Sequence, residues 1–125
     1  MPEEIELDRD DPRAIHLLAV VSGKAVGTAR VIIRRGNAKI GRMAVIKSHR
    51  RKGVGGELLR VAIKTALRLG ARTIYLHAQV PVIGFYEALG FHATGPVFDE
   101  VGIPHRKMVL KAVGIRQRIK RRDKR

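Results

Sequence analysis

The segment from Ile40 to Leu69, IGRMAVIKSHRRKGVGGELLRVAIKTALRL, decides the fold. It opens as an apolar run of strand type that we expect to end at Ile46. From Glu57 onward, apolar residues recur at helical spacing. Gly70 follows where a left-handed C-cap glycine belongs. The segment therefore predicts a strand, a glycine-rich turn and an amphipathic helix.

The turn between this strand and helix, residues 50–56, reads RRKGVGG. Glycines let a backbone turn tightly, and the helix that follows adds unpaired N–H groups and the positive end of its dipole. We therefore predict an anion-binding site suited to a pyrophosphate. Two known phosphate motifs do not fit. Gly55-Gly56-Glu57 stands where a Walker loop needs Gly-Lys-Ser/Thr, and Leu58 stands where a dinucleotide fingerprint needs its third glycine. A plain glycine turn with solvated bases is the alternative.

Strand-like runs and one further helix flank this segment. The predicted elements are strands over 14–21, 25–33 and 38–46, a helix over 57–69, a strand over 73–78, a helix over 82–89, and strands over 91–98 and 105–111, the last two joined by 99–104. Tight turns between the first three strands indicate an antiparallel meander. The order β-β-β-α-β-α-β-β predicts an α/β (α+β) layered fold with a mixed, mostly antiparallel central sheet.

The composition excludes several classes of protein. The chain has 125 residues, which fits one domain, and we assign it to residues 1–112. Its apolar content of 45% is enough for a core, and the absence of cysteine excludes disulfides and thiolate chemistry. No apolar run is long enough for a membrane span, and the start does not resemble a signal peptide, so we expect a cytoplasmic protein.

The charge is strongly positive and unevenly distributed. Lys and Arg number 26 against 11 Asp and Glu, a net charge of +15. The charged residues of segment 1–11 are six acids and one base, Arg9, whereas residues 113–125 form a basic C-terminal tail. Such a surface attracts polyanions such as nucleic acid, ribosomes or a phosphate-rich cofactor. A soluble arginine-rich surface without such a partner is the alternative.

Two motifs resemble a known family. Residues 50–55, RRKGVG, resemble the Arg/Gln-x-x-Gly-x-Gly/Ala signature of the GNAT superfamily of N-acetyltransferases, and residues 40–45 look like its central strand. Residues 85–91, FYEALGF, resemble its Phe-Tyr-x-x-x-Gly-Phe segment. The resemblance covers residues 3–111 and implies a GNAT-like sheet with helices on both faces.

A narrower resemblance is to the ElaA-like subgroup of bacterial acyltransferases. It rests on residues 6–8 (ELD), 77–79 (HAQ) and 98–105 (FDEVGIPH), with Gln79 where the family usually has Asn. Family members normally begin with a strand and one or two helices before the first hairpin, and that region is missing here. The resemblance therefore implies an exposed sheet edge and an uncovered side of the acceptor cleft, and we expect a homodimer that covers both.

The resemblance also implies a cofactor site. In the family, acetyl-CoA lies in a gap where two central parallel strands splay apart. The residues implied to bind it are Met43, Ala44, Val45, Arg50, Arg51, Lys52, Gly53, Val54, Gly55, Gly56, Gln79, Phe85 and Tyr86. No metal is expected. Tyr86 would protonate the departing thiolate, a role that suits a phenol with a pKa of about 10. Tyr75, inside a strand, is expected to pack in the core.

The nucleophile is expected to be the amine of the acceptor, a small molecule or a protein. Beyond residue 11 the carboxylates are Glu57, Glu87, Asp99, Glu100 and Asp123. Glu57 and Glu87 fall on predicted helices and read as surface residues. We predict that Glu100 and His105 line the acceptor site with Tyr86, and His77 is a further option. A water chain without a dedicated base is the alternative.

Three functions follow from these observations. The favoured one is an acetyl-CoA-dependent N-acyltransferase that moves an acetyl group to a primary amine by direct attack on the thioester. The second is a catalytically inactive relative that binds CoA. The third is a basic nucleic-acid or ribosome-binding module, which explains the charge but lacks an aromatic stacking platform.

Overall fold

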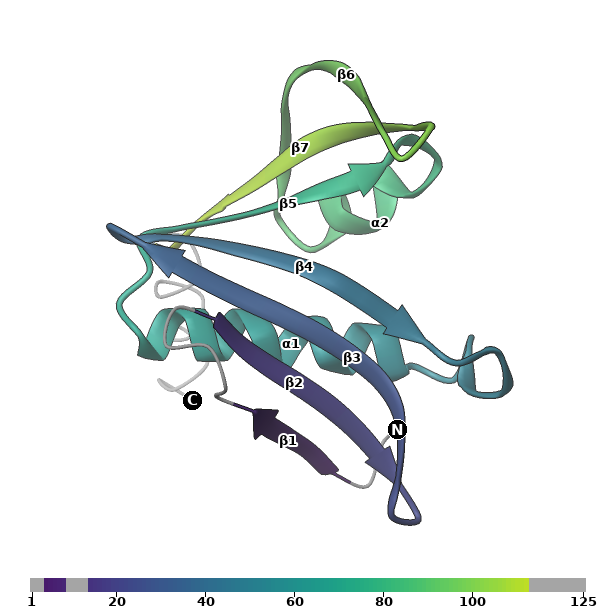
Figure 1. Ribbon diagram of the computed structural model, residues 1–125. Helices are drawn as coiled ribbons and strands as arrows, with labels where there is room; N and C mark the ends of the chain where they lie inside the picture. Colours follow the sequence, from purple (N-terminus) through teal and green to yellow (C-terminus); the bar gives the residue numbers. More distant parts are fainter. Residues whose placement is uncertain (1–3, 9–13, 113–125) are drawn as a thin grey trace, which may run out of the picture.

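The computed structural model describes residues 4–8 and 14–112, which form one seven-stranded sheet and two α-helices (Figure 1). The predicted basic tail at 113–125 lies outside the described residues. The strands are β1 Glu4–Asp8, β2 Ala14–Val21, β3 Lys24–Arg34, β4 Asn37–Val45, β5 Thr73–Gln79, β6 His92–Glu100 and β7 Ile103–Lys111. The helices are α1 Val54–Arg68 and α2 Ile83–Ala88, preceded by the short 3-10 turns Lys47–His49 and Val80–Val82. No helix in the described ranges could cross a membrane.

The predicted antiparallel meander is confirmed as β2, β3 and β4. Two-residue turns join these strands, Ser22-Gly23 and Arg35-Gly36, and all four residues have positive φ. Turns of this handedness match the right-handed twist of paired strands, which explains why such short connections form hairpins here.

One strand was not predicted. β1 pairs antiparallel with β2 along its whole length, from Glu4 opposite Val20 to Asp8 opposite His16. The edge beside residues 14–21, expected to be exposed, is therefore covered by the chain's own β1. The alternation of Glu4-Ile5-Glu6-Leu7-Asp8 is a period-two strand pattern that the prediction overlooked in the acidic opening of the chain.

Helix α1 buries one face against the meander. Its buried residues are Val54, Leu58, Leu59, Ala62 and Ala66. The helix begins three residues before the predicted start, because Gly53 adopts a left-handed conformation with φ 80° and lets Val54 enter the first turn. The helix lies so close to β3 that a Cβ on Gly27 would be 3.0 Å from Leu58 Cδ1.

The second half of the sheet is built on β5. This strand lies parallel to β4 and antiparallel to β7, giving the order β1-β2-β3-β4-β5-β7-β6. The predicted connection 99–104 is wrong in its length, since only Val101 and Gly102 form the turn between β6 and β7. Both have positive φ, as a two-residue hairpin requires. Glu100 therefore ends a strand and pairs with Ile103.

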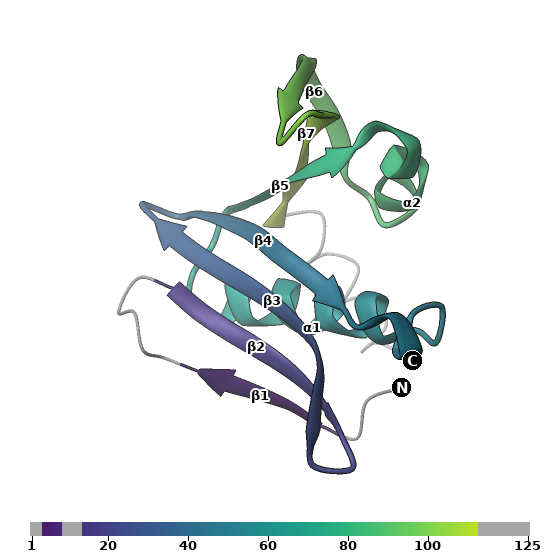
Figure 2. The same ribbon diagram turned by 45° about the vertical axis from the view of Figure 1, so that its right-hand side comes forward.

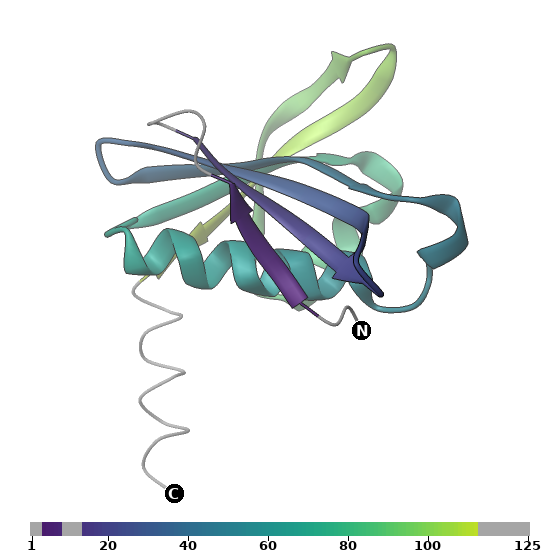
Figure 3. The ribbon, with the colours of Figure 1, turned by 60° about the horizontal axis from the view of Figure 1, so that its bottom comes forward.

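Both helices pack on the same face of the sheet, which is the rear face in the view of Figure 1. Figure 3 shows α1 below the sheet. The core on that face joins α1 residues to Ile74 and Met108, with Tyr86 of α2 packed against its edge. The second helical layer expected on the other face is not formed by residues 14–112. That face presents Tyr75, His77 and Lys107, which line surface pockets.

We expect Gly27→Val to destabilise the domain, because its side chain would overlap α1. The Cβ alone would lie 3.1 Å from Val54 Cγ1 and 3.3 Å from the Ala44 carbonyl oxygen. The free energy of unfolding should fall by about 1–3 kcal/mol, measured by urea denaturation followed by circular dichroism. Gly41→Ala is the control, since a Cβ there meets no atom within 4 Å. An unchanged midpoint for Gly27→Val would refute the proposed close packing.

Candidate active site

The candidate site begins where β4 and β5 separate. The two strands pair over only three positions, from Asn37 opposite Thr73 to Lys39 opposite Tyr75. Beyond that point they diverge, as Figures 1 and 2 show. A β-bulge lies in the part of β4 that does not pair with β5, where Arg42 has φ 48°. Because a bulge bends a strand and increases its twist, β4 leaves the plane of β5 here.

The divergence leaves a cavity of about 450 Å³ between the strands. Its walls come from β4, β5, α2 and the β6–β7 hairpin. The lining residues are Ile40, Gly41, Arg42, Met43, Leu76, His77, Ala78, Gln79, Val82, Tyr86, Glu100 and His105. Five predicted site residues from five elements therefore meet in one cavity: Met43, Gln79, Tyr86, Glu100 and His105.

The glycine-rich turn lies at the end of β4 and leads into α1. The Arg50 side chain folds back on this strand, and its Nε donates a hydrogen bond to the Val45 carbonyl oxygen at 2.9 Å. Arg51 and Gly53 then turn the chain with φ values of 61° and 80°. Arg50 thus fixes the turn to the strand, a positioning role that its motif does not reveal.

The first turn of α1 presents unpaired backbone donors. The Glu57 N–H is bonded to the Gly53 carbonyl oxygen at 3.0 Å, so the N–H groups of the three preceding helical residues have no carbonyl behind them within the helix. A Cβ on Gly56 would meet no atom within 4 Å, and one on Gly55 would meet only a Val45 methyl at 3.9 Å. The backbone is therefore accessible to an anion, and Arg51 and Lys52 lie exposed beside it.

Tyr86 reaches the cavity from α2. Its ring packs edge-on against Phe85 and Phe91, with centroid distances of 5.2 and 5.9 Å. Phe91 is fully buried, so it fixes the position of Tyr86, whereas Phe85 is half exposed. Burial raises the pKa of the Tyr86 hydroxyl above its usual value. The phenol therefore stays protonated at neutral pH and can donate a proton.

The opposite wall carries a carboxylate between two imidazoles. Glu100 Oε1 lies 3.1 Å from Nδ1 of His77, and its Oε2 lies 3.4 Å from Nε2 of His105. The hydrogen bond from His77 lowers the pKa of the Glu100 carboxyl below its usual value. The carboxylate is then ionised and accepts the proton of Nδ1, which leaves Nε2 of a neutral His77 with a lone pair.

His105 is nearly buried and holds its proton on the other nitrogen. Its Nδ1 lies 2.7 Å from the Ile103 carbonyl oxygen, which can only accept, so Nδ1 carries a hydrogen. In the neutral ring a lone pair on Nε2 would then face Glu100.

The other predicted residues lie around the cavity rather than in its lining. Val45 packs against the core, and Ala44 pairs with Thr28. Tyr75 does not pack in the core as expected; it is half-buried on the face opposite the helices. The sequence also gave no signal for Phe98, whose ring lies 4.9 Å from that of His77. Glu57, predicted to be a surface residue, is half-buried and pairs with Arg60.

The chain belongs to the GNAT acetyltransferase family. The model of the family described as Acetyltransferase (GNAT) family matches residues 1–91. The fold, the interrupted β4–β5 pairing and the glycine turn agree with this assignment, and the protein is therefore an acyltransferase.

Two curated relatives are similar over most of the chain. The uncharacterized N-acetyltransferase YjcF of Bacillus subtilis is 34% identical over 110 residues, which cover 87% of this chain and 79% of the relative. Protein ElaA of Escherichia coli is 28% identical over 102 residues, covering 78% of this chain and 67% of ElaA. The predicted likeness to the ElaA-like subgroup is confirmed.

Solved structures share the fold. An acyl-CoA N-acyltransferase from Pseudomonas aeruginosa superposes with a TM-score of 0.73 at 31% identity, over 78% of this chain and 68% of that chain. The Escherichia coli ElaA structure gives 0.72 at 28% identity, over 78% and 68%. A Bacillus subtilis acetyltransferase in complex with CoA gives 0.72 at 20% identity, over 86% and 97%, which shows the fold alone.

We expect removal of the His77 imidazole to raise the pKa of Glu100. The hydrogen bond from Nδ1 is the main cause that favours the ionised carboxylate, so His77→Ala should move the titration toward that of an ordinary glutamate. Nuclear magnetic resonance of 13C-carboxyl-labelled glutamate gives the measurement. His92→Ala, at an exposed position on β6, is the control and should leave the titration of Glu100 unchanged. Equal titration in both variants would exclude the contact.

Proposed function

We propose that the protein transfers an acetyl group from acetyl-CoA to a primary amine by direct attack of the amine on the thioester. The observation that carries the proposal is the cavity between β4 and β5. It brings a protonated phenol, Tyr86, and an ionised carboxylate with two imidazoles into the lining of one space. A proton donor and a proton acceptor within one site are what aminolysis of a thioester requires.

The cofactor would lie along β4 with its pyrophosphate at the start of α1. Beyond Lys39 the backbone of β4 no longer pairs with β5, so the main chain of Met43 and Val45 can bond the amides of a pantetheine arm. At the far end of this edge the first N–H groups of α1 suit a diphosphate. A Bacillus subtilis acetyltransferase with bound CoA has the same fold.

The chemical step uses residues from both walls. The amine nitrogen attacks the thioester carbonyl carbon, a C–N bond forms, and the C–S bond breaks with its electron pair on sulfur. The Tyr86 hydroxyl gives its proton to the thiolate, and the proton that the nitrogen loses as the amide forms restores the phenol through solvent. The raised pKa of this phenol keeps the proton available at neutral pH.

The acceptor must lose a proton before it attacks, since a lysine-type ammonium has a pKa of about 10.4. We assign Nε2 of His77 as the acceptor of this proton. Glu100 accepts a hydrogen bond from Nδ1, which fixes the imidazole in the form with a lone pair on Nε2. Nε2 of His105 lies 3.4 Å from the other carboxylate oxygen. Glu100 is thereby a positioning residue whose negative charge also attracts the ammonium form of the acceptor.

Replacement of Tyr86 by phenylalanine should lower kcat by about 10²- to 10⁴-fold while acetyl-CoA still binds, since only the proton donor is lost. Thiol release from acetyl-CoA with a screened amine gives the rate, and calorimetry gives the affinity. Glu87→Gln, exposed on the same helix, is the control and should keep full activity. Unchanged kcat in Tyr86→Phe would remove Tyr86 from the mechanism. Binding without turnover in the wild-type protein would identify a CoA-binding relative instead.

Acetyl-CoA should bind far more tightly than S-acetylpantetheine, which has the thioester and pantetheine arm but no diphosphate. Because the diphosphate would accept several charge-assisted hydrogen bonds, its absence should lower the affinity at least about tenfold. Calorimetry with both compounds, at two salt concentrations, measures the difference. Equal affinities would show that the turn before α1 does not hold a diphosphate.

A further inference from the structure

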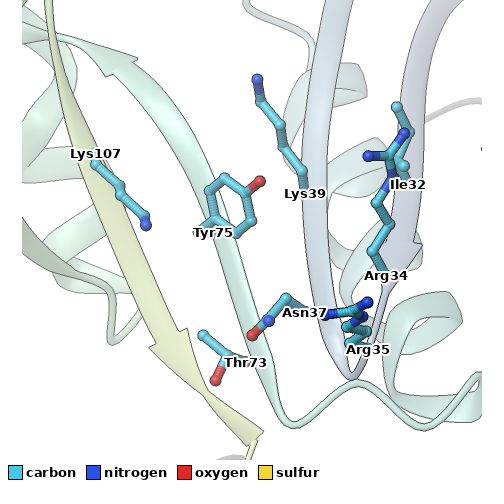
Figure 4. Close-up of a pocket in the computed structure, with 8 residues that line it drawn as sticks. All are labelled: Ile32, Arg34, Arg35, Asn37, Lys39, Thr73, Tyr75 and Lys107. Carbon is cyan, nitrogen blue, oxygen red and sulfur yellow. The ribbon is translucent and has the colours of Figure 1, made fainter.

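A second pocket lies on the sheet face that α1 and α2 leave open. Its volume is about 530 Å³, and its lining residues are Ile32, Arg34, Arg35, Asn37, Lys39, Thr73, Tyr75 and Lys107 (Figure 4). Four of the eight lining residues are cationic, and none is acidic. The pocket therefore concentrates positive potential in a concave site, where low-dielectric walls strengthen it.

Three adjacent strands hold the centre of this pocket. Tyr75 of β5 lies between Lys39 of β4, its register partner, and Lys107 of β7. The Lys107 Nζ sits 4.7 Å from the centroid of the Tyr75 ring, a cation–π contact that fixes the ammonium over the pocket. In Figure 4 the side chains of Lys39 and Lys107 flank this ring from either side.

Among residues 14–112, the four cations that line this pocket form no ion pair. Residues 14–112 contain four acids, Glu57, Glu87, Asp99 and Glu100, and the ion pairs among these residues do not include Arg34, Arg35 or Lys39. Like charges gathered without counter-charge repel one another, so an anion in the pocket would be stabilised. The geometry therefore favours a ligand with a carboxylate or phosphate.

The pocket adjoins the candidate active site. Tyr75 and His77 are next-but-one neighbours on β5, so they lie on the same face about 7 Å apart along the strand. Their rings have centroids 6.2 Å apart, and His77 binds Glu100. The positive charge of Lys39 also contributes to lowering the pKa of Glu100, which shows that the two clusters share one electrostatic environment.

We propose that this pocket recognises an anionic group on the acceptor, so that the substrate is a small primary amine with an oxyanion, a carboxylate or a phosphate, about 7 Å or more from its nitrogen. The inference rests on the proposed amine acetylation. The amine lies beside Glu100 and His77, and the oxyanion lies among Arg34, Lys39 and Lys107. The pocket would thus select substrates by charge and by length.

A nucleic acid is a weaker match for this surface. Single-stranded nucleic acid is bound by a groove of cations with aromatic rings open for base stacking. Here Tyr75 is half-buried between strands, and one side of its ring is occupied by Lys107. A compact anion on a short chain fits the pocket better.

The test uses primary amines of equal length that differ in their far end: hexylamine, 6-aminohexanoate, 6-aminohexyl phosphate and 1,6-diaminohexane. CoA release is measured for each, and kcat/KM for one or both oxyanion-bearing amines should exceed that for hexylamine by about tenfold or more. The better of the two identifies carboxylate or phosphate. Equal kcat/KM across the series would overturn the proposal, whereas no release with any amine would refute the proposed acetylation itself.

Variants locate the effect. Arg34→Gln and Lys107→Gln should each lower kcat/KM for the preferred anionic amine by about tenfold and leave hexylamine within about twofold. Arg68→Gln, exposed on α1 on the other side of the sheet, is the control for loss of one charge. If the pocket variants slow all amines equally, the residues have a general rather than a recognition role.

A binding measurement keeps the inference testable without turnover. Calorimetry with 6-acetamidohexanoate and its phosphate counterpart, the expected products, should show millimolar or tighter binding that Arg34→Gln weakens. Absence of binding by both would overturn the proposal, as would binding of a single-stranded oligonucleotide that depends on Arg34 in place of product binding.

Discussion

The structure depends on the early end of pairing between β4 and β5. After three residue pairs the two central strands separate, and the bulge at Arg42 turns β4 further away. Every backbone N–H and C=O on these facing edges must then find a partner other than the neighbouring strand. A sheet that was paired throughout would have no cavity and no free edge for an extended ligand. The interruption therefore creates the site, and the surrounding elements supply its chemistry.

Three separate elements complete the site around this interruption. Arg50 fastens the glycine turn to the last carbonyl of β4, so the first N–H groups of α1 lie in line with the open strand edge. Helix α2, held by Phe91, brings Tyr86 to one wall. The tight β6–β7 hairpin brings Glu100 to the other wall, between imidazoles of β5 and β7. Each group is placed by a rigid element, which preserves the mutual geometry that proton transfer needs.

The two faces of the sheet differ in character because α1 and α2 both cover the same one. On the covered face, alternate residues such as Ile74 and Met108 form the core. The residues between them point the other way, so β5 also presents Tyr75 and His77 on the open face. This period of two places the basic pocket and the acceptor side of the cavity on one continuous surface. The positive charge of the composition is thus partly concentrated beside the candidate site.

The sequence by itself determined the strands of the meander, helix α1, the position of the glycine turn and the motif with Tyr86, because each depends on local periodicity, glycine conformation or a contiguous pattern. It did not reveal β1, which forms a strand by pairing with β2. It also did not reveal the two-residue turn that makes Glu100 a strand residue. Tertiary structure alone decided that Glu100 meets both His77 and His105, and that Tyr75 faces outward. Contacts of this kind join distant positions through strand register, and register is fixed by the packing of the whole sheet.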